Sequence, residues 1–325
     1  MAWILQGART ALCIGGRMVE TYKLKAGIYE AEILDQGAIL YSFSIDGHDI
    51  IVGFDDKEEN IASDAYFSQV IGPFANRICD ARYTMDGAVH TLEANNGRNS
   101  LHSGSRNYGF HKWTLDALSA GSVTLSLDSP ESNGLDGDHH VTVTYSLSES
   151  GALSIDYSVT STRKCPVNIT NHAFFNLDGH GDMRKHRALI PADSYIAVDD
   201  TLIPTSIEPV RGTDFDFNSM RAIGERRNGE YDHCFILRKG ERTVVENDDL
   251  RLEMETDLPG VQFYTSGHLD RGFRGKGHTE LSRFSAFCLE SEFYPDFPNR
   301  SDFKGAYLEP GKAFETRTVF RLTRK

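Results

Sequence analysis

Two segments of this chain place a group able to move protons beside apolar residues. His172 lies within NITNHAFFNL, and Glu290 follows the apolar run Phe287–Leu289 in FCLESE. Burial raises the pKa of a carboxyl group and makes it a stronger base near neutral pH. Histidine changes its charge in the same pH range. The two residues are therefore candidates for an acid–base pair. The alternatives are an edge-strand glutamate that reaches solvent and an exposed strand face with one histidine.

Two turn-rich segments add polar groups. His102 ends the asparagine- and glycine-rich stretch NNGRNSLH, and loops of this composition often carry binding groups. Asn76 and Arg77 stand in GPFANRI, where the guanidinium offers a rigid fork of donors. Each has a structural alternative. His102 is then an ordinary turn residue, and Arg77 holds a carboxylate or turn carbonyls.

Two apolar strands also carry one polar residue each. Asp232 precedes the apolar run CFIL in YDHCFIL, where it either faces a ligand or simply begins the strand. Gln262 alternates with Val261 and Phe263 in PGVQFY, so its side chain points away from the face that they bury. Both residues are candidates for binding polar groups of a ligand.

The segment around His172 predicts a binding surface. Alternate residues of a strand point to the same side, so a strand over residues 168–177 has one polar row and one apolar row. A polar row that includes an aromatic ring is typical of a sugar cleft. The polar row holds Asn168, Thr170, His172, Phe174 and Asn176, and the apolar row holds Ile169, Phe175 and Leu177.

A set of histidines and a carboxylate is also found in metal sites. No two of these residues have the close H-x-H or H-x-x-x-H spacing common among metal-binding histidines, so we predict no metal. The sequence lacks a P-loop, a Rossmann glycine fingerprint and a serine nucleophile elbow. His139 and His140 follow the acidic, glycine-rich stretch 134–138, and we expect them to be solvated.

The elements that must hold these side chains are strands. Alternation of apolar and polar residues is the strongest periodic signal, and it predicts antiparallel sheets with one dry face. Residues 56–68 hold a short helix at most, and no repeat or linker divides the chain. We therefore predict an all-β fold, one large antiparallel β-sandwich, as a single domain over residues 1–325. The alternating stretches are 29–34 and 39–45 around a turn at 35–37, 140–147 and 152–159 around a turn at 148–151, 251–256, and 313–322.

Composition narrows the partners. Lys and Arg number 34 and Asp and Glu 47, which gives a net charge of −13. A field of that sign repels phosphate backbones and anionic lipid, so nucleic-acid and membrane roles are disfavoured. The five cysteines are widely spaced, odd in number and without a C-x-x-C pair, which indicates reduced thiols in a cytoplasmic protein. We expect no signal peptide in MAWILQGARTALCIGG and no membrane-spanning segment.

Seven segments, in order, resemble the aldose 1-epimerase (galactose mutarotase) family. They run from about residue 66 to residue 299 and read YFSQVIGPFANRI, LEANNGRNSLHSG, VNITNHAFFNL, ADSYIAVDDTLIPTSIEPVRGTDFDF, YDHCFIL, DLPGVQFYTS and FCLESEFYPDFPN. The resemblance implies a large antiparallel sandwich and a cofactor-independent isomerase. Such an enzyme interconverts the α and β anomers of a free aldose such as galactose or glucose.

The resemblance also implies roles for individual residues. His172 matches the general acid, Glu290 the general base, and His102 the second active-site histidine. The residues that match ligands of the sugar hydroxyls are Asn76, Arg77, Asp232 and Gln262.

Several positions depart from the family pattern and leave the preferred aldose open. Pro73 stands where arginine is common, Arg98 where proline is, and Ser103 where glycine is. Ser266–Gly267 replaces a Gly-Asn pair, and the stretch around Leu135–Asp138 replaces a Gly-aromatic-Pro-Gly loop.

Three other functions remain as alternatives. A non-catalytic sugar-binding protein would need the hydroxyl ligands but not the acid–base pair. A phosphosugar 1-epimerase would need cations, which Arg271, Arg274 and Lys276 offer if they do not simply form a solvated basic loop. A metal-dependent β-barrel enzyme is the third. The predicted partner is a small sugar, and the chain is expected to be a monomer or a homodimer.

Overall fold

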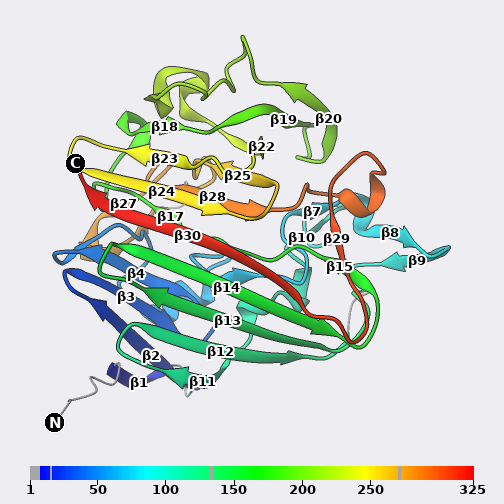
Figure 1. Ribbon diagram of the computed structural model, residues 1–325, viewed down its shortest axis with the longest axis horizontal. Helices are drawn as coiled ribbons and strands as arrows, with labels where there is room; N and C mark the ends of the chain where they lie inside the picture. The colour runs from blue at the N-terminus through cyan, green and yellow to red at the C-terminus, as the bar shows by residue number, and fades with distance from the viewer. Residues whose placement is uncertain (1–7, 15–16, 132–134, 270–271) are drawn as a thin grey trace.

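The computed structural model describes residues 8–14, 17–131, 135–269 and 272–325 (Figure 1). In this part of the chain the strands pair antiparallel in large sheets, so the predicted all-β sandwich is confirmed. The largest sheet has nine strands in the order β11 (Thr114–Leu118), β12 (Ser122–Ser129), β13 (His139–Leu147), β14 (Ala152–Ser161), β30 (Phe314–Arg324), β24 (Leu250–Thr256), β23 (Thr243–Glu246), β18 (Arg187–Leu189) and β21 (Arg221–Ala222).

A second sheet carries much of the candidate chemistry. It has six strands, and β30 of the large sheet runs close to it in the middle of the molecule (Figure 1). Its order is β17 (Phe174–Phe175), β28 (Phe287–Glu292), β25 (Gly260–Tyr264), β22 (Asp232–Leu237), β19 (Ala192–Val198) and β20 (Pro204–Pro209).

The N-terminal part of the chain forms a third sheet, drawn in blue in Figure 1. Its buried side chains belong to the same core cluster as those of β12 to β14, so the two sheets pack face to face. Its strands are β1 (Ala8–Ile14), β2 (Arg17–Ala26), β3 (Tyr29–Leu34), β4 (Leu40–Ile45) and β5 (His48–Asp49).

Short elements connect these sheets. The α-helix α1 (Lys57–Ala62) lies within the stretch predicted to hold one, and the side chain of Asp56 caps it by accepting from the amide of Glu58. Among the described residues no helix is long and apolar enough to cross a bilayer. Two-stranded ladders join β6 (Val70–Ile71) to β16 (Thr170–Asn171), β7 (Arg77–Ile78) to β10 (Ser100–Leu101), β8 (Arg82–Met85) to β9 (Ala88–Thr91), β15 (Cys165–Val167) to β29 (Ala306–Leu308) and β26 (Phe273–Arg274) to β27 (Glu280–Leu281). Single 3₁₀ turns occupy Cys79–Ala81, Gly104–Arg106, Tyr108–Phe110, Met183–Lys185, Ile223–Glu225, Arg227–Gly229, Lys276–His278 and Phe297–Asn299.

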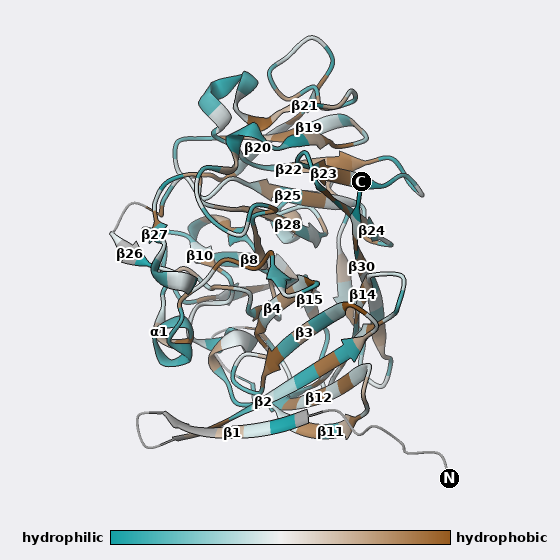
Figure 2. Cartoon of the chain, turned by 90° about the vertical axis from the view of Figure 1, so that its left-hand side faces the viewer, coloured by the Kyte–Doolittle hydropathy of each residue, from teal (hydrophilic) through white to brown (hydrophobic). Residues whose placement is uncertain are grey.

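The large sheet shows why alternation predicted it. Along β13 and β14 every second residue is buried, and the hairpin turns at residues 148–151 as expected. Val143 and Tyr157 face each other across the pair on the core side. Figure 2 shows hydrophobic and hydrophilic residues mixed along strands such as β2 and β12. One-sided burial fixes the register, because a slip of one residue would turn the apolar set to solvent.

Strand β28 differs because all six of its residues are buried. Phe287 and Leu289 belong to the main core cluster. Glu290, which points the other way, is only 3% exposed. The strand is central, paired with β17 on one side and β25 on the other, so the alternative of an edge-strand glutamate is wrong. The sheet thus places a carboxyl group at a buried position.

Candidate active site

All seven candidate residues line one cavity of about 460 Å³. That volume lies within the range of small-molecule sites. Three of them come from adjacent strands, because β22, β25 and β28 are neighbours and Gln262 pairs directly with Glu290. The seven are Asn76, Arg77, His102, His172, Asp232, Gln262 and Glu290.

His172 lies at the junction between β16 and β17, where the chain crosses from β6 to β28. Its backbone is fixed on both sides, since its amide donates to the carbonyl of Gln69 at 2.9 Å and its carbonyl accepts from the amide of Ser68 at 3.0 Å. Nε2 of its imidazole lies 3.6 Å from Oε1 of Glu290. The predicted acid and base therefore face each other inside the cavity.

Burial shifts the pKa values of these two groups in opposite directions and reverses their usual order. Desolvation lowers the pKa of His172 to about 4. Desolvation, and then the nearby carboxyls of Glu292 and Asp232, raise the pKa of Glu290 well above its usual range. A proton shared by the two groups therefore belongs on Glu290, with His172 neutral.

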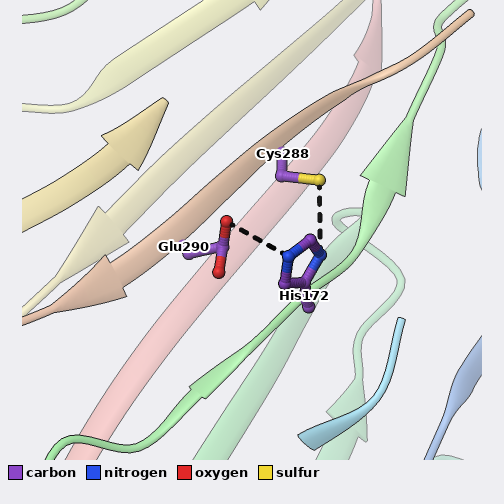
Figure 3. A group of neighbouring side chains, drawn as sticks. All are labelled: His172, Cys288 and Glu290. Carbon is purple, nitrogen blue, oxygen red and sulfur yellow. Dashed lines mark hydrogen bonds and ion pairs between the residues drawn. The ribbon is translucent and has the colours of Figure 1, made fainter. Parts of the chain in front are cut away.

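Cys288 lies on the same face of β28 as Glu290 and also contacts the histidine. Its sulfur is 3.6 Å from Nδ1 of His172, while the carboxyl group of Glu290 approaches Nε2 (Figure 3). Ligand atoms of the three residues lie within 4.8 Å of one another, which is close enough for a metal centre. However, the sulfur and the carboxylate approach different nitrogens of one ring. A single ion bonds only one of those nitrogens, so the geometry fits a hydrogen-bonded line better than a metal site.

His102 follows β10 in a left-handed backbone conformation, with φ of 51°. Its Nδ1 accepts a hydrogen bond from the amide of Asn76 at 3.1 Å. Desolvation, with the neighbouring His172 and Arg77, lowers its pKa well below 6.5, so the ring is neutral. A neutral ring that accepts at Nδ1 carries its proton on Nε2. The rings of His102 and His172 lie 5.5 Å apart, which leaves His102 as a hydrogen-bond donor beside the acid–base pair.

The remaining candidates are held by their neighbours. Asn76 accepts from the amide of Arg77 and donates toward Glu292, which fixes its side-chain amide. Nε of Arg77 donates to Asn96, another cavity residue, at 3.1 Å. Its partner is a side-chain carbonyl of a turn-rich segment, as in the structural alternative, but the arginine also lines the cavity.

Asp232 and Gln262 form a pair on neighbouring strands. The amide of Gln262 donates to Oδ1 of Asp232 at 2.6 Å. Val261 and Phe263, on the other face of β25, are buried in the main core as expected. One carboxylate and one amide are thereby left facing the cavity, where hydroxyl groups of a ligand would find both acceptors and a donor.

Sequence reasoning missed an aromatic wall of this cavity. The ring of Tyr66 packs against His102 at 4.9 Å and His172 at 6.2 Å, and Tyr264 lies 6.2 Å from His172. Tyr66 takes a φ of 58°, which is unusual for a bulky residue and recurs at functional sites. Both tyrosines stand inside the segments that resemble the family, but nothing in their local pattern marks them.

The predicted polar row over residues 168–177 is wrong. The segment is not one strand, since it splits into β16 and β17 at His172. Only His172 and Phe174 of that row line the cavity in the described structure. The side chain of Asn168 instead bonds the backbone of Ala75 and Phe293, and Asn176 bonds Gly181 and Ser285. The apolar row does face the core: Ile169, Phe175 and Leu177 are buried there.

The expectation of a solvated His139–His140 pair is wrong for one of the two. His140 is exposed, but His139 begins β13 and is only 2% exposed. The hydroxyl of Tyr108 lies 2.7 Å from its Nδ1. The alternation of buried and exposed residues along β13 continues from Val141 back to His139, so the pattern of the strand predicts this burial.

The departures from the family pattern lie outside the described lining of the cavity. Ser103 bonds both the amide and the carbonyl of Phe74, and Arg98 pairs with Asp80 at the surface. The side chain of Leu135 is buried in a second core cluster. The other departures are Pro73 and Ser266–Gly267. None of these residues lines the cavity directly.

A model of the aldose 1-epimerase family matches residues 20–321. The chain belongs to the aldose 1-epimerase family. It is therefore an isomerase, and the predicted reaction class is confirmed.

Relatives of this epimerase are similar over nearly their whole length. Galactose mutarotase from Rattus norvegicus is 35% identical over 328 residues, which cover 95% of each chain. Galactose mutarotase from Homo sapiens is 34% identical over 343 residues, 99% of each chain. Aldose 1-epimerase from Escherichia coli (strain K12) is 34% identical over 315 residues, 89% of this chain and 91% of that one.

Solved structures agree on the fold of the epimerase. An aldose epimerase homologue from C. elegans superposes with a TM-score of 0.89 at 26% identity, over 98% of this chain and 99% of that one. Galactose 1-epimerase from Lactobacillus acidophilus gives 0.88 at 20% identity, with the same coverage. At that lower identity the likeness concerns the fold alone.

Proposed function

We propose that this epimerase acts on a free aldose such as galactose or glucose, with Glu290 as base and His172 as acid. One observation carries the proposal. Oε1 of Glu290 and Nε2 of His172 are both buried and face each other at 3.6 Å in a cavity whose other polar groups suit sugar hydroxyls. A general acid and a general base must reach two different oxygens of one hemiacetal. Both oxygens are bonded to the same carbon, so two groups that lie 3.6 Å apart can reach them together.

The reaction needs two proton transfers and one bond cleavage. The carboxylate of Glu290 takes the proton of the anomeric hydroxyl, and the electrons of that O–H bond form the C1=O double bond. The bond from C1 to the ring oxygen breaks, and the ring oxygen takes the proton from Nε2 of His172. Rotation about C1–C2 turns the other face of the carbonyl to the hydroxyl. The reverse transfers then close the ring as the other anomer.

The protonation states of the site fit this cycle. Ring opening leaves Glu290 protonated and His172 neutral, which is the state that burial favours. The cyclic sugar needs the same single proton on His172 instead. Hydrogen bonds from the sugar to the charged forms favour that shift. Desolvation of the two side chains thus disfavours the ion pair and favours the uncharged pair that accompanies the open-chain aldehyde.

The other residues hold the sugar. His102, with its proton on Nε2, donates beside the anomeric or ring oxygen and steadies charge that develops there. Asn76, Arg77, Asp232 and Gln262 also line the cavity. Hydrogen bonds within the protein fix these side chains before the sugar binds. The sugar is then held in one orientation, so less entropy is lost on the way to the transition state.

The alternatives have less support. A sugar-binding protein without catalysis has no use for a buried acid–base pair. For a phosphosugar epimerase the basic loop is a poor anchor, because Lys276 is already bonded to Asp49 and to the backbone of Ile51. Arg274 is exposed, and Arg271 lies outside the described residues.

The test is polarimetry of freshly dissolved α-galactose and α-glucose, with and without the purified protein. We expect catalysed mutarotation of the free sugars and little or none of glucose 6-phosphate. A protein that binds these sugars by calorimetry but leaves the rotation rate at its uncatalysed value would disprove the proposal. A screen that adds arabinose, xylose and fucose would identify the preferred aldose.

We also propose a cytoplasmic protein formed of a single domain over residues 1–325. Four cysteines of the described residues are free thiols, three of them buried, which supports a reducing compartment. The main core draws on strands from both ends of the chain, which supports one domain. The expectation of a monomer or homodimer remains a prediction that gel filtration with light scattering would test.

A further inference from the structure

One neighbour of His172 has no part in the proposed chemistry. Cys288 alternates with Glu290 along β28, so both side chains point to the same face of the sheet. Cys288 is fully buried, and its sulfur lies 3.6 Å from Nδ1 of His172. Desolvation and the carboxyl of Glu290 raise the pKa of this thiol well above its usual range, so it is not a thiolate and carries no charge.

The two ring nitrogens of His172 have different neighbours. The sulfur of Cys288 lies beside Nδ1 and can accept a weak hydrogen bond from it, whereas Nε2 faces the carboxyl group of Glu290, whose proton it can accept. A neutral imidazole carries its one proton on the nitrogen that has the acceptor. Nδ1 therefore keeps its proton, and the lone pair of Nε2 faces Glu290.

We propose that Cys288 is a positioning residue, whose sulfur holds the Nδ1–H of His172 so that Nε2 alone exchanges protons with Glu290 and the sugar. This inference rests on the proposed function. In each turnover Nε2 gives a proton to the ring oxygen and takes it back on closure, while the Nδ1 proton never leaves. The other tautomer would turn an N–H of His172 toward protonated Glu290, with no lone pair left to recover the proton.

The remaining groups that face His172 do not compete for Nδ1. They hold the ring in its plane or face the cavity. Phe174 stacks on the imidazole at 5.0 Å. The others are His102, Tyr66, Tyr264 and Glu290.

The chain offers a matched control. Cys165 is also a buried thiol beside a buried histidine, with its sulfur 3.3 Å from Nε2 of His139. That histidine is not among the described residues that line the cavity. The same substitution at either cysteine changes the buried volume by a similar amount and removes a similar contact, so only the effect on the reaction should differ.

The experiment compares Cys288→Val, Cys288→Ala and Cys288→Ser with Cys165→Val and Cys165→Ala. Polarimetry gives kcat, KM and the pH dependence of kcat/KM, and ¹⁵N NMR of labelled histidine reports the tautomer of His172 without any sugar. We expect the wild-type protein to hold the Nδ1–H tautomer and Cys288→Val to populate both. For Cys288→Val and Cys288→Ala we expect kcat about tenfold lower, as for loss of one orienting hydrogen bond, and a shifted acidic limb of kcat/KM.

The serine variant restores an oxygen acceptor and should recover most of kcat. The Cys165 variants should unfold at lower denaturant concentration but keep the wild-type kcat and the wild-type acidic limb. An unchanged His172 tautomer with an unchanged acidic limb in Cys288→Val would overturn the inference. So would an equal loss of kcat in the Cys165 variants. Absence of catalysed mutarotation in the wild-type protein would instead defeat the proposed function, and the NMR measurement keeps the two failures apart.

Discussion

Within the described residues, two buried histidines each contact a buried thiol, His172 with Cys288 and His139 with Cys165. Desolvation lowers the pKa of both histidines to about 4. They differ in what the second nitrogen meets. At His139 the Tyr108 hydroxyl lies at Nδ1, and the carbonyl of Asp136 lies 3.1 Å from Nε2. At His172 the second nitrogen faces a carboxyl group across an open cavity.

This difference separates a structural histidine from a candidate catalytic one. Both are desolvated to a similar extent, so neither burial nor the shifted pKa tells them apart. Fixed protein partners occupy both nitrogens of His139, and a ring with both nitrogens occupied has nothing left for a ligand. His172 keeps one nitrogen for groups that change during a reaction. The informative observation is that one ring nitrogen faces the cavity beside a carboxyl group, and not the size of the pKa shift.

Substitution of each histidine in turn should give the largest difference between a catalytic and a structural role. We expect His172→Asn to lower kcat by about 10³-fold, because it removes the general acid, with a small effect on stability. His139→Asn should leave kcat within about twofold and lower the free energy of unfolding by roughly 1–3 kcal/mol, because Tyr108 loses its partner. Polarimetry and urea unfolding of both variants measure this. Similar kcat values for the two variants would contradict the distinction.

The two buried glutamates of β28 extend the comparison to carboxyl groups. Glu290 faces the cavity, whereas Glu292 is bonded to Asn76 and is not among the described lining residues. Desolvation raises the pKa of both groups well above the usual range. We expect Glu290→Gln to lower kcat by about 10²-fold or more, because an amide cannot accept the anomeric proton. Glu292→Gln replaces a neutral acid by a neutral amide and should cost less than about tenfold. The reverse order of the two kcat values would be incompatible with these roles.

Removal of a proposed hydroxyl ligand should act on binding more than on chemistry. Gln262→Leu deletes the donor to Asp232 and one polar group of the cavity. We expect KM for galactose to rise about tenfold and kcat to fall much less, since the acid–base pair remains. Initial rates over a range of sugar concentrations separate the two parameters. A large fall in kcat at unchanged KM would assign Gln262 to the reacting atoms instead.

The smallest effect concerns stability in acid. His139 stays neutral in the folded chain down to about pH 4, whereas an unfolded histidine takes up its proton near pH 6.5. The unfolded state binds more protons in that window, so the free energy of unfolding falls as pH drops from 6.5 toward 4. His139→Asn should flatten this dependence by up to about 1.4 kcal/mol per pH unit, and His172→Asn by a similar amount. Urea unfolding between pH 4.5 and 7 measures the slopes. Equal slopes in wild type and both variants would contradict the burial argument.

Much of the fold follows from the sequence because its signal is local. In β13, β14 and β30 one face meets the core and the other meets water, so hydropathy alternates residue by residue. The prediction of one strand around His172 was wrong for the opposite reason. Both of its faces are buried, and the break between β16 and β17 is set by pairing with β6 and β28, which lie far away in the chain.

The site could be predicted only in part for the same reason. Asp232, Gln262 and Glu290 interrupt apolar strands, and a polar residue in such a place is conspicuous. The aromatic wall of Tyr66 and Tyr264, and the contact of Cys288 with His172, depend on which strands are neighbours. Family resemblance supplied the order of the segments, but no local pattern distinguishes these side chains from ordinary core residues.

Burial of β28 on both faces makes this strand intolerant of insertion or deletion. One added or lost residue before Cys288 would turn Leu289 into the cavity and Glu290 into the apolar core, so packing and chemistry would fail together. Length changes between related chains should therefore occur in the turns at either end of the strand, and its six residues should vary only by substitution.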